Sequence, residues 1–494
     1  MSDSSRAAAW VRIVVFLLFA LVVARTSADV DLWGHVLFGG DTVDQRAIPF
    51  IDPYSFTSDR TLMDHEWLAE VIMNLSYRTM GSAGLVGLRL LTLVTIGLLV
   101  GASIRSERLS QAGRDALIML GVILTLPRTQ HVRPQMFSIL LFGVLLLLLT
   151  RADRGHRRAL WLIPPLMATW ANLHGGWMVG LGTFGLWSAR EFVRNARWAA
   201  RAQIVILLGV SALATLANAY GWELWRFFWQ TVGLARPDIE EWGPITQVGP
   251  GLLALWLTSL LLAVWAAIRA GQERRWDYLF LVGLLAVLSF RVSRLDAFFG
   301  LAVVMLLQPR LPRPASASAS TSRTAGSVAR SAALPVVVAI MTPLILSAAR
   351  RPLSCIEMNG SSWLPEGEAV EFARINHLRG RMLTFFDWGE YAIWHLSPAV
   401  KVSMDGRRET AYSAAQIDRH LRIYSDRATD DEIQNLDVDY VWLPRTLQVV
   451  NRFSRHGWVP IHTGRVSAIL ARNPGLQFRP VPPAPEHARC FPGP

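Results

Sequence analysis

The chain has 494 residues, of which 52% are hydrophobic and 17% are charged, and its mean hydropathy is +0.31. This composition excludes a single soluble core, because repeated apolar runs of about 17–25 residues have the length of membrane-spanning helices. The net charge of +12 comes almost entirely from arginine, since Lys401 is the only lysine. The arginines lie in short loops between apolar runs. Membrane topology and lipid headgroups therefore explain the charge better than nucleic acid does, and we expect no nucleic-acid partner.

The apolar runs predict a polytopic α-helical membrane protein with about eleven spans. The first run could be a signal peptide, but no A-x-A cleavage site closes it and more spans follow, so we expect a retained helix. The expected spans are 10–26, 83–104, 115–127, 135–150, 159–171, 177–189, 203–219, 251–268, 277–290, 295–308 and 332–348. The segment 66–80 has one apolar and one polar face, which is typical of an amphipathic helix at a membrane interface, and Asp64 can cap its start.

The placement of the arginines predicts how these spans are oriented. With the N-terminus inside, the cytoplasmic loops are the basic segments 105–114, 151–158, 190–201 and 269–276 and the Pro/Ala/Ser-rich linker 309–331. The outside segments are then 27–82, 128–134, 172–176, 220–250, 291–294 and the tail. We therefore expect a transmembrane domain over 1–349 and an extracytoplasmic domain over 350–494.

The first long polar segment, 27–70, carries nine acidic residues and only two arginines. Within it, Asp29 and Asp31 form a D-x-D directly after the first span. Two such carboxylates can chelate a hard cation, here Mg²⁺ or Mn²⁺. Alternatively, one can act as a general base while the other orients a substrate hydroxyl. The plainer interpretation is a solvated pair of acids at a helix end.

The motifs of this segment resemble those of a known family. The run DVDLWGHVLFGG, followed by IPFIDPYSFT and MDHEWLAEV, resembles the first extracytoplasmic loop of bacterial polytopic glycosyltransferases with the GT-C fold. These are relatives of the protein O-mannosyltransferases, aminoarabinose transferases and oligosaccharyltransferases. The resemblance is strongest to a bacterial branch that carries D-x-D-L-W-x-H, D-P-[FY]-S-[FY]-T and H-E-W-L in this order.

The resemblance implies a GT-C-like fold and a lipid-linked sugar donor. The implied function is an inverting glycosyltransferase in the bacterial inner membrane. It would move a sugar from a polyprenyl-phosphate-type carrier to an envelope acceptor, which could be a glycan, a lipid or a protein. Its chemistry would take place on the extracytoplasmic face. Asp31 is the preferred catalytic base and Asp29 its partner, and relatives differ in whether a divalent ion is used.

Further polar residues in the outside segments are candidates for substrate contacts. His35 could line the site or pack on Trp33, and His65 and Glu66 could contact donor or acceptor, although helix capping competes for the acid. Asn172 and His174 suit hydrogen bonding at a pocket edge, but NLHGGW is also an ordinary turn.

Four arginines in short outside loops, Arg128, Arg133, Arg291 and Arg294, go against the charge rule, and this makes them candidates for function. Arg133 could grip a lipid phosphate with its forked guanidinium, and Arg291 and Arg294 could bind phosphate or pyrophosphate. The alternative is contact with bulk membrane lipids by snorkelling at the interface.

The tail alternates helix-like and strand-like patterns, which predicts a small α/β domain. PEGEAVEFARINHL and YSAAQIDRHLRIY are expected helices, and RMLTFF, VKVSMD, VDYVWLP and RVSAILA are expected strands. The run FFDWGEYAIW is similar to the W-W-D-x-G signature of oligosaccharyltransferases, with Phe385 and Phe386 in place of the tryptophans. Asp387, Asp405 and Arg407 are expected to be structural. Cys355 and Cys490 could form one disulfide on the oxidising side of the membrane, or remain two thiols.

The sequence gives less support to other classes of function. The chain has no Walker A motif, H-E-x-x-H or paired C-x-x-C, which argues against nucleotide hydrolysis and structural zinc. A non-catalytic transporter or scaffold for envelope polysaccharide assembly would need ionisable groups within its spans, and these spans are nearly free of acids. An envelope-polymer ligase would keep the fold and change donor and acceptor. The sequence does not separate these acceptors.

Overall fold

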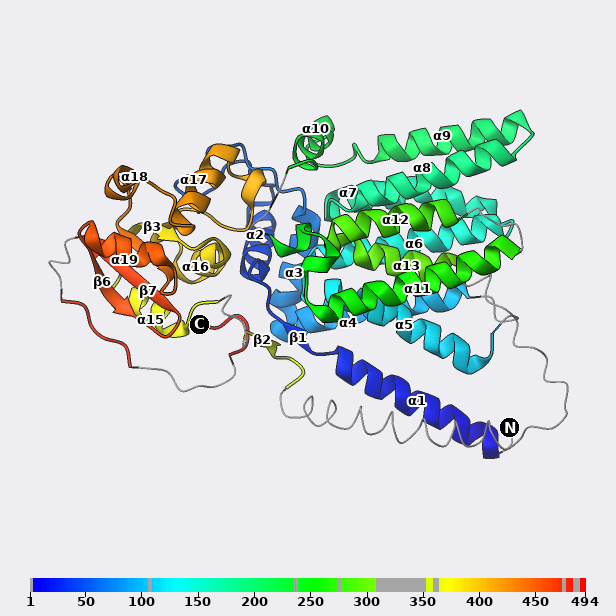
Figure 1. Ribbon diagram of the computed structural model, residues 1–494, viewed down its shortest axis with the longest axis horizontal. Helices are drawn as coiled ribbons and strands as arrows, with labels where there is room; N and C mark the ends of the chain where they lie inside the picture. The colour runs from blue at the N-terminus through cyan, green and yellow to red at the C-terminus, as the bar shows by residue number, and fades with distance from the viewer. Residues whose placement is uncertain are drawn as a thin grey trace. The chain divides into compact units, whose positions relative to one another are not determined.

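The structure is a computed structural model that describes residues 3–104, 109–234, 236, 239–272, 278–307, 352–358, 364–472, 477–482 and 489–494 (Figure 1). The chain divides into two compact units. The helical unit comprises Met1–Thr26 and Val86–Ser354, and the α/β unit comprises Ser27–Leu85 and Cys355–Pro494. The expected division at residue 349 remains a prediction.

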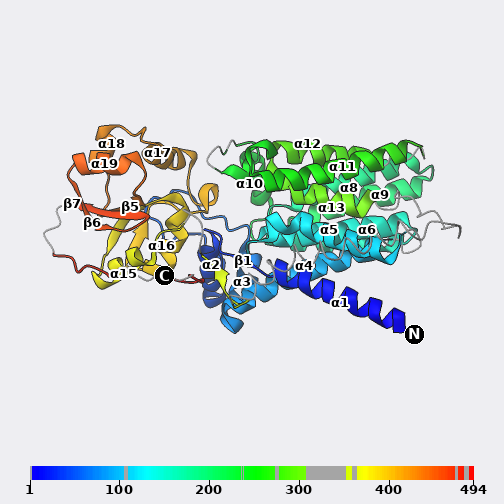
Figure 2. The same cartoon turned by 60° about the horizontal axis from the view of Figure 1, so that its bottom comes forward.

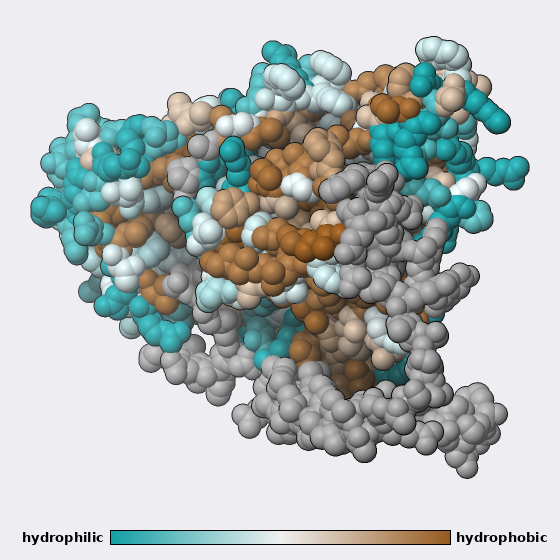
Figure 3. Space-filling model, turned by 45° about the vertical axis from the view of Figure 1, so that its right-hand side comes forward, coloured by the Kyte–Doolittle hydropathy of each residue, from teal (hydrophilic) through white to brown (hydrophobic). Residues whose placement is uncertain are grey.

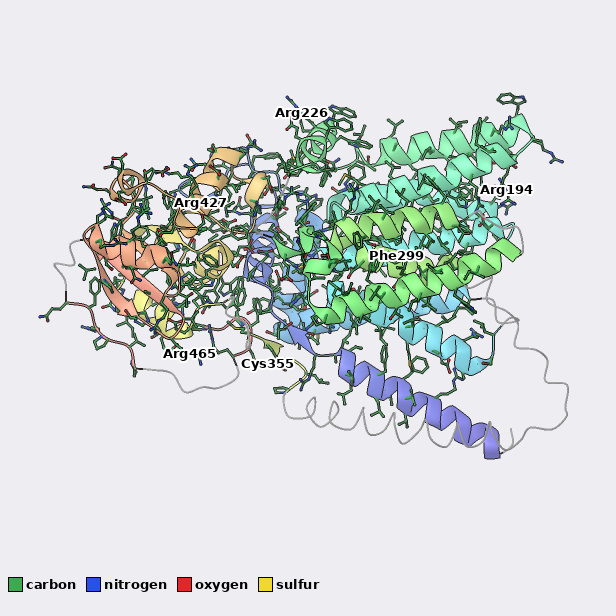
Figure 4. The ribbon with its side chains drawn as sticks, in the orientation of Figure 1. Arg194, Arg226, Phe299, Cys355, Arg427 and Arg465 are labelled. Carbon is green, nitrogen blue, oxygen red and sulfur yellow. A yellow bond between two sulfur atoms is a disulfide. The ribbon has the colours of Figure 1, made fainter. Side chains whose placement is uncertain are left out.

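The helical unit is built from long apolar helices that run side by side (Figures 1 and 2). They are α1 (Asp3–Val23), α4 (Ser82–Ser103), α5 (Gln111–Thr129), α6 (Gln135–Asp153), α7 (Ile163–Leu173), α8 (Trp177–Arg194), α9 (Trp198–Ala214), α11 (Pro250–Gln272), α12 (Leu279–Arg291) and α13 (Asp296–Leu307). The short helix α10 (Trp222–Thr231) does not run along them (Figure 1). All residues of α13 are buried, including Phe299, which is labelled in Figure 4. A helix that is apolar all round and fully covered is the centre of its bundle, and α13 contacts α5, α6, α11 and α12.

The first ten expected spans each coincide with a helix of the structure. In the part of the chain that the structure describes, three helical segments are long and apolar enough to cross a membrane by length and composition: Ser82–Ser103, Gln135–Asp153 and Pro250–Ile268. The linker 309–331 and the expected span 332–348 lie outside the described residues. The number of eleven spans therefore stays a prediction.

Large apolar side chains are exposed on the outside of the helical unit (Figure 3). Leu98, Leu261 and Phe280 are 67%, 69% and 69% exposed. Monomeric soluble proteins rarely expose wide apolar surfaces. This surface is therefore typical of a bundle that lies in a lipid bilayer.

The first two helices of the α/β unit are α2 (Leu32–Gln45) and α3 (Trp67–Met80), which pack closely. A Cβ at Gly39 would lie under 3.0 Å from the backbone oxygen of Glu70, so glycine is required for this approach. The Nδ2 of Asn74 donates a hydrogen bond of 2.7 Å to the Val36 carbonyl. The helix expected over 66–80 is therefore confirmed, and its polar face is the buried one.

The start of α3 differs from the expected cap. The Asp64 carboxylate accepts the backbone N–H of Glu66 at 3.2 Å, which makes a turn before the helix. Glu66 itself is the residue that precedes α3, and its side chain makes no capping hydrogen bond. The expectation that Asp64 caps the helix was wrong by two positions, because the chain turns once more before the helix begins.

The tail forms the expected α/β fold. Its helices are α15 (Gly367–Ile375), α16 (Gly389–Leu396), α17 (Ala414–Tyr424), α18 (Asp430–Gln434) and α19 (Gln448–Arg455). Its five-stranded sheet contains β3 (Gly380–Thr384), β4 (Val400–Val402), β5 (Tyr440–Pro444), β6 (Trp458–Thr463) and β7 (Ser467–Arg472). The order is β4-β3-β5-β7-β6, with β3 parallel to β4 and β5, and β7 antiparallel to β5 and β6. The expected helices and strands are confirmed, and α16, α18, α19 and β6 are additional.

The segment that leads from α2 to α3 lies along the edge of this sheet at β4. The N–H of Phe56 donates to the Val402 carbonyl at 3.2 Å, and the N–H of Met63 donates to the Thr410 carbonyl at 3.1 Å. The Asp59 carboxylate accepts hydrogen bonds from the backbone and side chain of Ser413. The acidic first segment and the tail are therefore parts of one folded unit.

A disulfide between Cys355 and Cys490 closes the α/β unit (Figure 4). It joins the short strand β2 (Ile356–Glu357) to the last residues of the chain, near β1 (Thr26–Ser27). Phe491 packs on Trp33 with ring centroids 5.2 Å apart, and the Trp33 indole donates to the Pro492 carbonyl at 2.8 Å. Of the two alternatives left open by the sequence, the structure has the disulfide. The aromatic contacts explain why the Pro-rich end is held in place.

Candidate functional site

Asp29 and Asp31 lie at the start of α2 and have different local surroundings. Asp29 Oδ1 accepts the backbone N–H of Asp31 at 3.1 Å, a turn typical of aspartate. Asp31 is the residue that precedes α2, but its side chain makes no capping hydrogen bond. The Oδ1 atom of Asp31 instead lies against Gly406. A Cβ added at Gly406 would lie under 3.0 Å from this oxygen. The fold thus directs Asp31 toward the turn after β4, while Asp29 shapes the backbone.

Glu390, in the first turn of α16, lies beside this acid pair. Its side chain is buried, and Oε2 accepts the N–H of Gly34 at 3.1 Å. Burial, and then the charges of Asp31 and Asp405, raise the pKa of Glu390 well above its usual range. Sequence reasoning missed this residue; the run DWGE, in the segment similar to the oligosaccharyltransferase signature, was the available signal.

A buried ion network holds the turn that contains Gly406. Arg407 contacts Asp405 at 2.7 Å and Asp52 at 2.9 Å, and the Tyr412 hydroxyl donates to Asp405 at 2.7 Å. The guanidinium also lies over the ring of Phe38, 4.6 Å from its centroid. Burial raises the pKa of Asp405, but the Arg407 charge and hydrogen bonds outweigh it and hold that pKa below its usual value. The network ties the first segment to the sheet.

The predicted site residues His35, His65 and Glu66 lie near a buried acid of α3. His35 Nδ1 is 2.9 Å from Oε1 of Glu70, and His65 Nε2 is 3.4 Å from Glu66 Oε1. Burial and the neighbouring charge of Asp64 raise the pKa of Glu70 well above its usual range, and burial raises the pKa of Asp64 to about 6. The α/β unit therefore contains a second group of acids that titrate unusually high.

Arginines of the helical unit converge on Glu241, which lies in the loop before α11. Arg128 Nη1 and Arg133 Nη1 are each 3.2 Å from Glu241 Oε1, and Arg128 also pairs with Asp296 at 2.9 Å. Burial raises the pKa of Glu241, but the charges of Arg133, Arg294 and Arg128 outweigh burial and lower that pKa to about 2. This part of the helical unit strongly favours a negative charge.

The three predicted arginines, Arg133, Arg291 and Arg294, do not form one cluster. Arg133 is one of the Glu241 contacts, and Arg294 lies over the ring of Trp242, 5.8 Å from its centroid. Arg291 is exposed at the last residue of α12. Arg128, which was noticed only as an exception to the charge rule, is almost completely buried in this group.

Asn172 and His174 close the turn between α7 and α8. The Nδ2 of Asn172 donates to the carbonyls of Ala168 and Ala217, at 2.9 and 2.8 Å. His174 Nδ1 accepts the Gly176 N–H at 3.0 Å and lies 2.7 Å from the Ser138 hydroxyl. The two side chains thus bind groups of their own turn and of neighbouring segments, and a substrate contact remains a prediction.

Among the described residues, no three or more His, Cys, Asp or Glu side chains are grouped so that they could hold a metal ion. Asp29 uses one carboxylate oxygen for the Asp31 N–H. The carboxylates of Asp29 and Asp31 are nevertheless the oxygen donors that Mg²⁺ prefers. Their role as ligands of Mg²⁺ or Mn²⁺ stays a prediction.

The chain resembles several solved membrane glycosyltransferases. ArnT from Cupriavidus metallidurans aligns with a TM-score of 0.57 and 13% identity over 95% of this chain and 98% of ArnT. The oligosaccharyltransferase of Archaeoglobus fulgidus, tethered to an acceptor peptide, aligns with a TM-score of 0.56 and 12% identity over 88% of this chain and 69% of its own. The mycobacterial arabinofuranosyltransferase AftD aligns with a TM-score of 0.53 and 14% identity. The alignment covers 94% of this chain and 40% of the AftD chain.

No protein-family model matches the chain, and no curated protein matches it significantly. At identities this low the alignments establish the fold. The chain has the GT-C fold of polytopic membrane glycosyltransferases, as its first-segment motifs predicted.

Proposed function

We propose that this protein is an inverting glycosyltransferase that uses a lipid-linked sugar donor. The donor is a sugar on a polyprenyl-phosphate-type carrier, and the acceptor is a hydroxyl of an envelope glycan, lipid or protein. The observation that carries the proposal is Asp31, a carboxylate directed away from its own helix and toward the turn at Gly406. The GT-C fold supports the reaction class.

Asp31 is assigned the role of general base. It takes the proton from the acceptor hydroxyl while the hydroxyl oxygen attacks the anomeric carbon of the donor sugar. The bond from that carbon to the carrier phosphate oxygen breaks, and the phosphate leaves with the electron pair. Attack on the side opposite the leaving group inverts the anomeric configuration. Asp29 supports the turn that holds Asp31.

The arginines near Glu241 are assigned to the donor phosphate. Guanidinium groups bind phosphate oxygens through charge-assisted, forked hydrogen bonds, and such donors stabilise the charge that develops on a leaving phosphate. The low pKa of Glu241 supports this assignment, because it reports an environment that stabilises an anion.

We place the protein in the bacterial inner membrane with the α/β unit on the extracytoplasmic side. The apolar surface of the helical unit supports contact with membrane lipids. The disulfide supports an oxidising compartment for the α/β unit.

The proposal is tested by mass spectrometry of envelope glycans from a deletion strain that carries either the wild type or Asp31→Asn. The wild type should restore a sugar modification, and Asp31→Asn should not, because losing a positioned acid–base group costs about 10²–10⁴-fold in rate. A chelator that abolishes transfer by the purified enzyme, with recovery on Mg²⁺ or Mn²⁺, would assign the acids to a metal as well. Full restoration by a well-folded Asp31→Asn protein would refute the catalytic assignment.

A further inference from the structure

The helix that follows Asp31 is capped in an unusual way. The N-terminal N–H groups of a helix have no partners within the helix, and an aspartate at the preceding position normally accepts one of them with its own side chain. Asp31 occupies that position in α2 and makes no such bond. The third N–H of the helix, that of Gly34, is instead bound by Glu390 Oε2 at 3.1 Å. Glu390 thus performs the capping from a segment 356 residues away.

Glycines at two positions make this arrangement sterically possible. A Cβ at Gly34 would lie under 3.0 Å from Glu390 Oε2. At Gly406, a Cβ would lie under 3.0 Å from both Asp31 Oδ1 and Glu390 Oε1. The two carboxyl groups therefore converge on the same small volume beside the Gly406 backbone. A side chain at either glycine would displace at least one of them.

Four charged groups surround Glu390. Asp29 and Asp31 face it from the segment before α2, and Asp405 and Arg407 face it from the turn after β4. Three of these four groups are acids, and Glu390 is buried. Burial and the charges of Asp31 and Asp405 therefore raise the pKa of Glu390 well above its usual range. Whether charged or neutral, a carboxyl group can accept the Gly34 N–H through an oxygen.

We propose that Glu390 is a positioning residue for the Asp31 carboxylate. By capping α2 in place of Asp31, it keeps Asp31 directed toward the Gly406 turn, where the acceptor hydroxyl would be deprotonated. This inference rests on the proposed function. Glu390 itself touches no reacting atom in this scheme.

The central test compares Glu390→Ala, Glu390→Gln and Glu366→Ala in detergent-purified full-length enzyme. Glu366 is a matched control, because it is also buried in the α/β unit and also accepts backbone N–H groups, those of Val466 and Ser467. Glu390→Ala should lower kcat by about 10²-fold, the effect of a misplacement near 1 Å, with little change in donor KM. Glu390→Gln keeps an oxygen that can accept the Gly34 N–H and should retain most activity. Glu366→Ala should leave kcat within a few-fold of the wild type.

The variant Gly34→Ala extends the test. Gly34→Ala should lower kcat as Glu390→Ala does, although alanine is the better helix former. Wild-type kcat in Gly34→Ala would contradict the close packing on which the inference stands.

Hydrogen–deuterium exchange at residues 29–40 gives a readout that needs no turnover. Glu390→Ala should speed exchange in the first turn of α2, whereas Glu390→Gln and Glu366→Ala should not. Equal effects of Glu390→Ala and Glu366→Ala on exchange and kcat would reduce Glu390 to a structural residue and overturn the proposal. If Asp31→Asn is inactive but Glu390→Ala is fully active, only the positioning role fails; if Asp31→Asn is active, the proposed function and the positioning role fail together.

Discussion

The substitution Arg407→Met tests the buried network that holds the first segment to the sheet. Arg407 joins Asp52 to Asp405, and the two acid side chains are 0% exposed in these pairs. Methionine keeps much of the length of the side chain but removes its charge and all of its donors. Two carboxyl groups would then be buried close together without their shared cation.

Breaking a buried ion pair by removing one partner costs about 3–5 kcal/mol, because the remaining charge stays buried. In a folded unit of this size, each kcal/mol shifts the unfolding midpoint by about 2–4 °C, so Arg407→Met should lower the Tm of the α/β unit by roughly 6–20 °C. Transfer activity should also fall, because Asp405 and Arg407 flank the glycine against which Asp31 lies.

The assay is thermal unfolding of detergent-purified protein, followed by near-ultraviolet circular dichroism, to which the buried Trp388, Trp442 and Trp458 contribute. The matched control is Arg452→Met in the same unit. Its partner acids Asp426 and Asp430 are 31% and 67% exposed, so its loss should cost no more than about 1 kcal/mol.

A triple variant with Asp52→Asn, Asp405→Asn and Arg407→Met should recover much of the stability, because no unpaired charge stays buried. Equal shifts in Tm for Arg407→Met and Arg452→Met would refute the reasoning, since burial would then make no difference to these ion pairs.

Three further predictions concern the disulfide, the arginines and the topology. Replacing Cys355 and Cys490 by serine should lower the free energy of unfolding, measured by denaturant titration, by about 5 kcal/mol. Two free thiols in a peptide map of the unreduced wild type would contradict the presence of the disulfide. Arg133→Ala should weaken donor binding by about 10–100-fold, which would be measured as a higher donor KM. The control variant Arg226→Ala, at an exposed arginine, should leave the donor KM unchanged. Equal effects of the two substitutions would contradict a specific contact between Arg133 and the phosphate. Reporter fusions after residues 158, 201 and 320 should be cytoplasmic and one at residue 420 extracytoplasmic, and a cytoplasmic signal at 420 would reverse the orientation.

Local patterns were sufficient to predict most elements of this fold. The apolar runs predicted the helices of the helical unit except α10, which lies in the expected outside segment 220–250, because helix length and hydropathy are properties of contiguous sequence. The alternating patterns of the tail predicted β3, β4, β5 and β7, and a chain with only two cysteines allowed only one disulfide. The family motifs led to Asp31 and to the GT-C fold.

The surroundings of the candidate base were decided by the tertiary structure alone. Glu390 is hydrogen-bonded to Gly34, and Arg407 to Asp52, although the two residues of each pair are more than 350 positions apart in the sequence. Hydrophobic periodicity does not predict such pairings. The burial of Glu70 and Asn74 also ran against the amphipathic pattern of α3, because the close approach at Gly39 and the Val36 carbonyl gave polar groups an inward partner. Sequence spacing determines which residues share a helix face. Whether that face binds water, lipid or another buried polar group depends on the segment that packs against it.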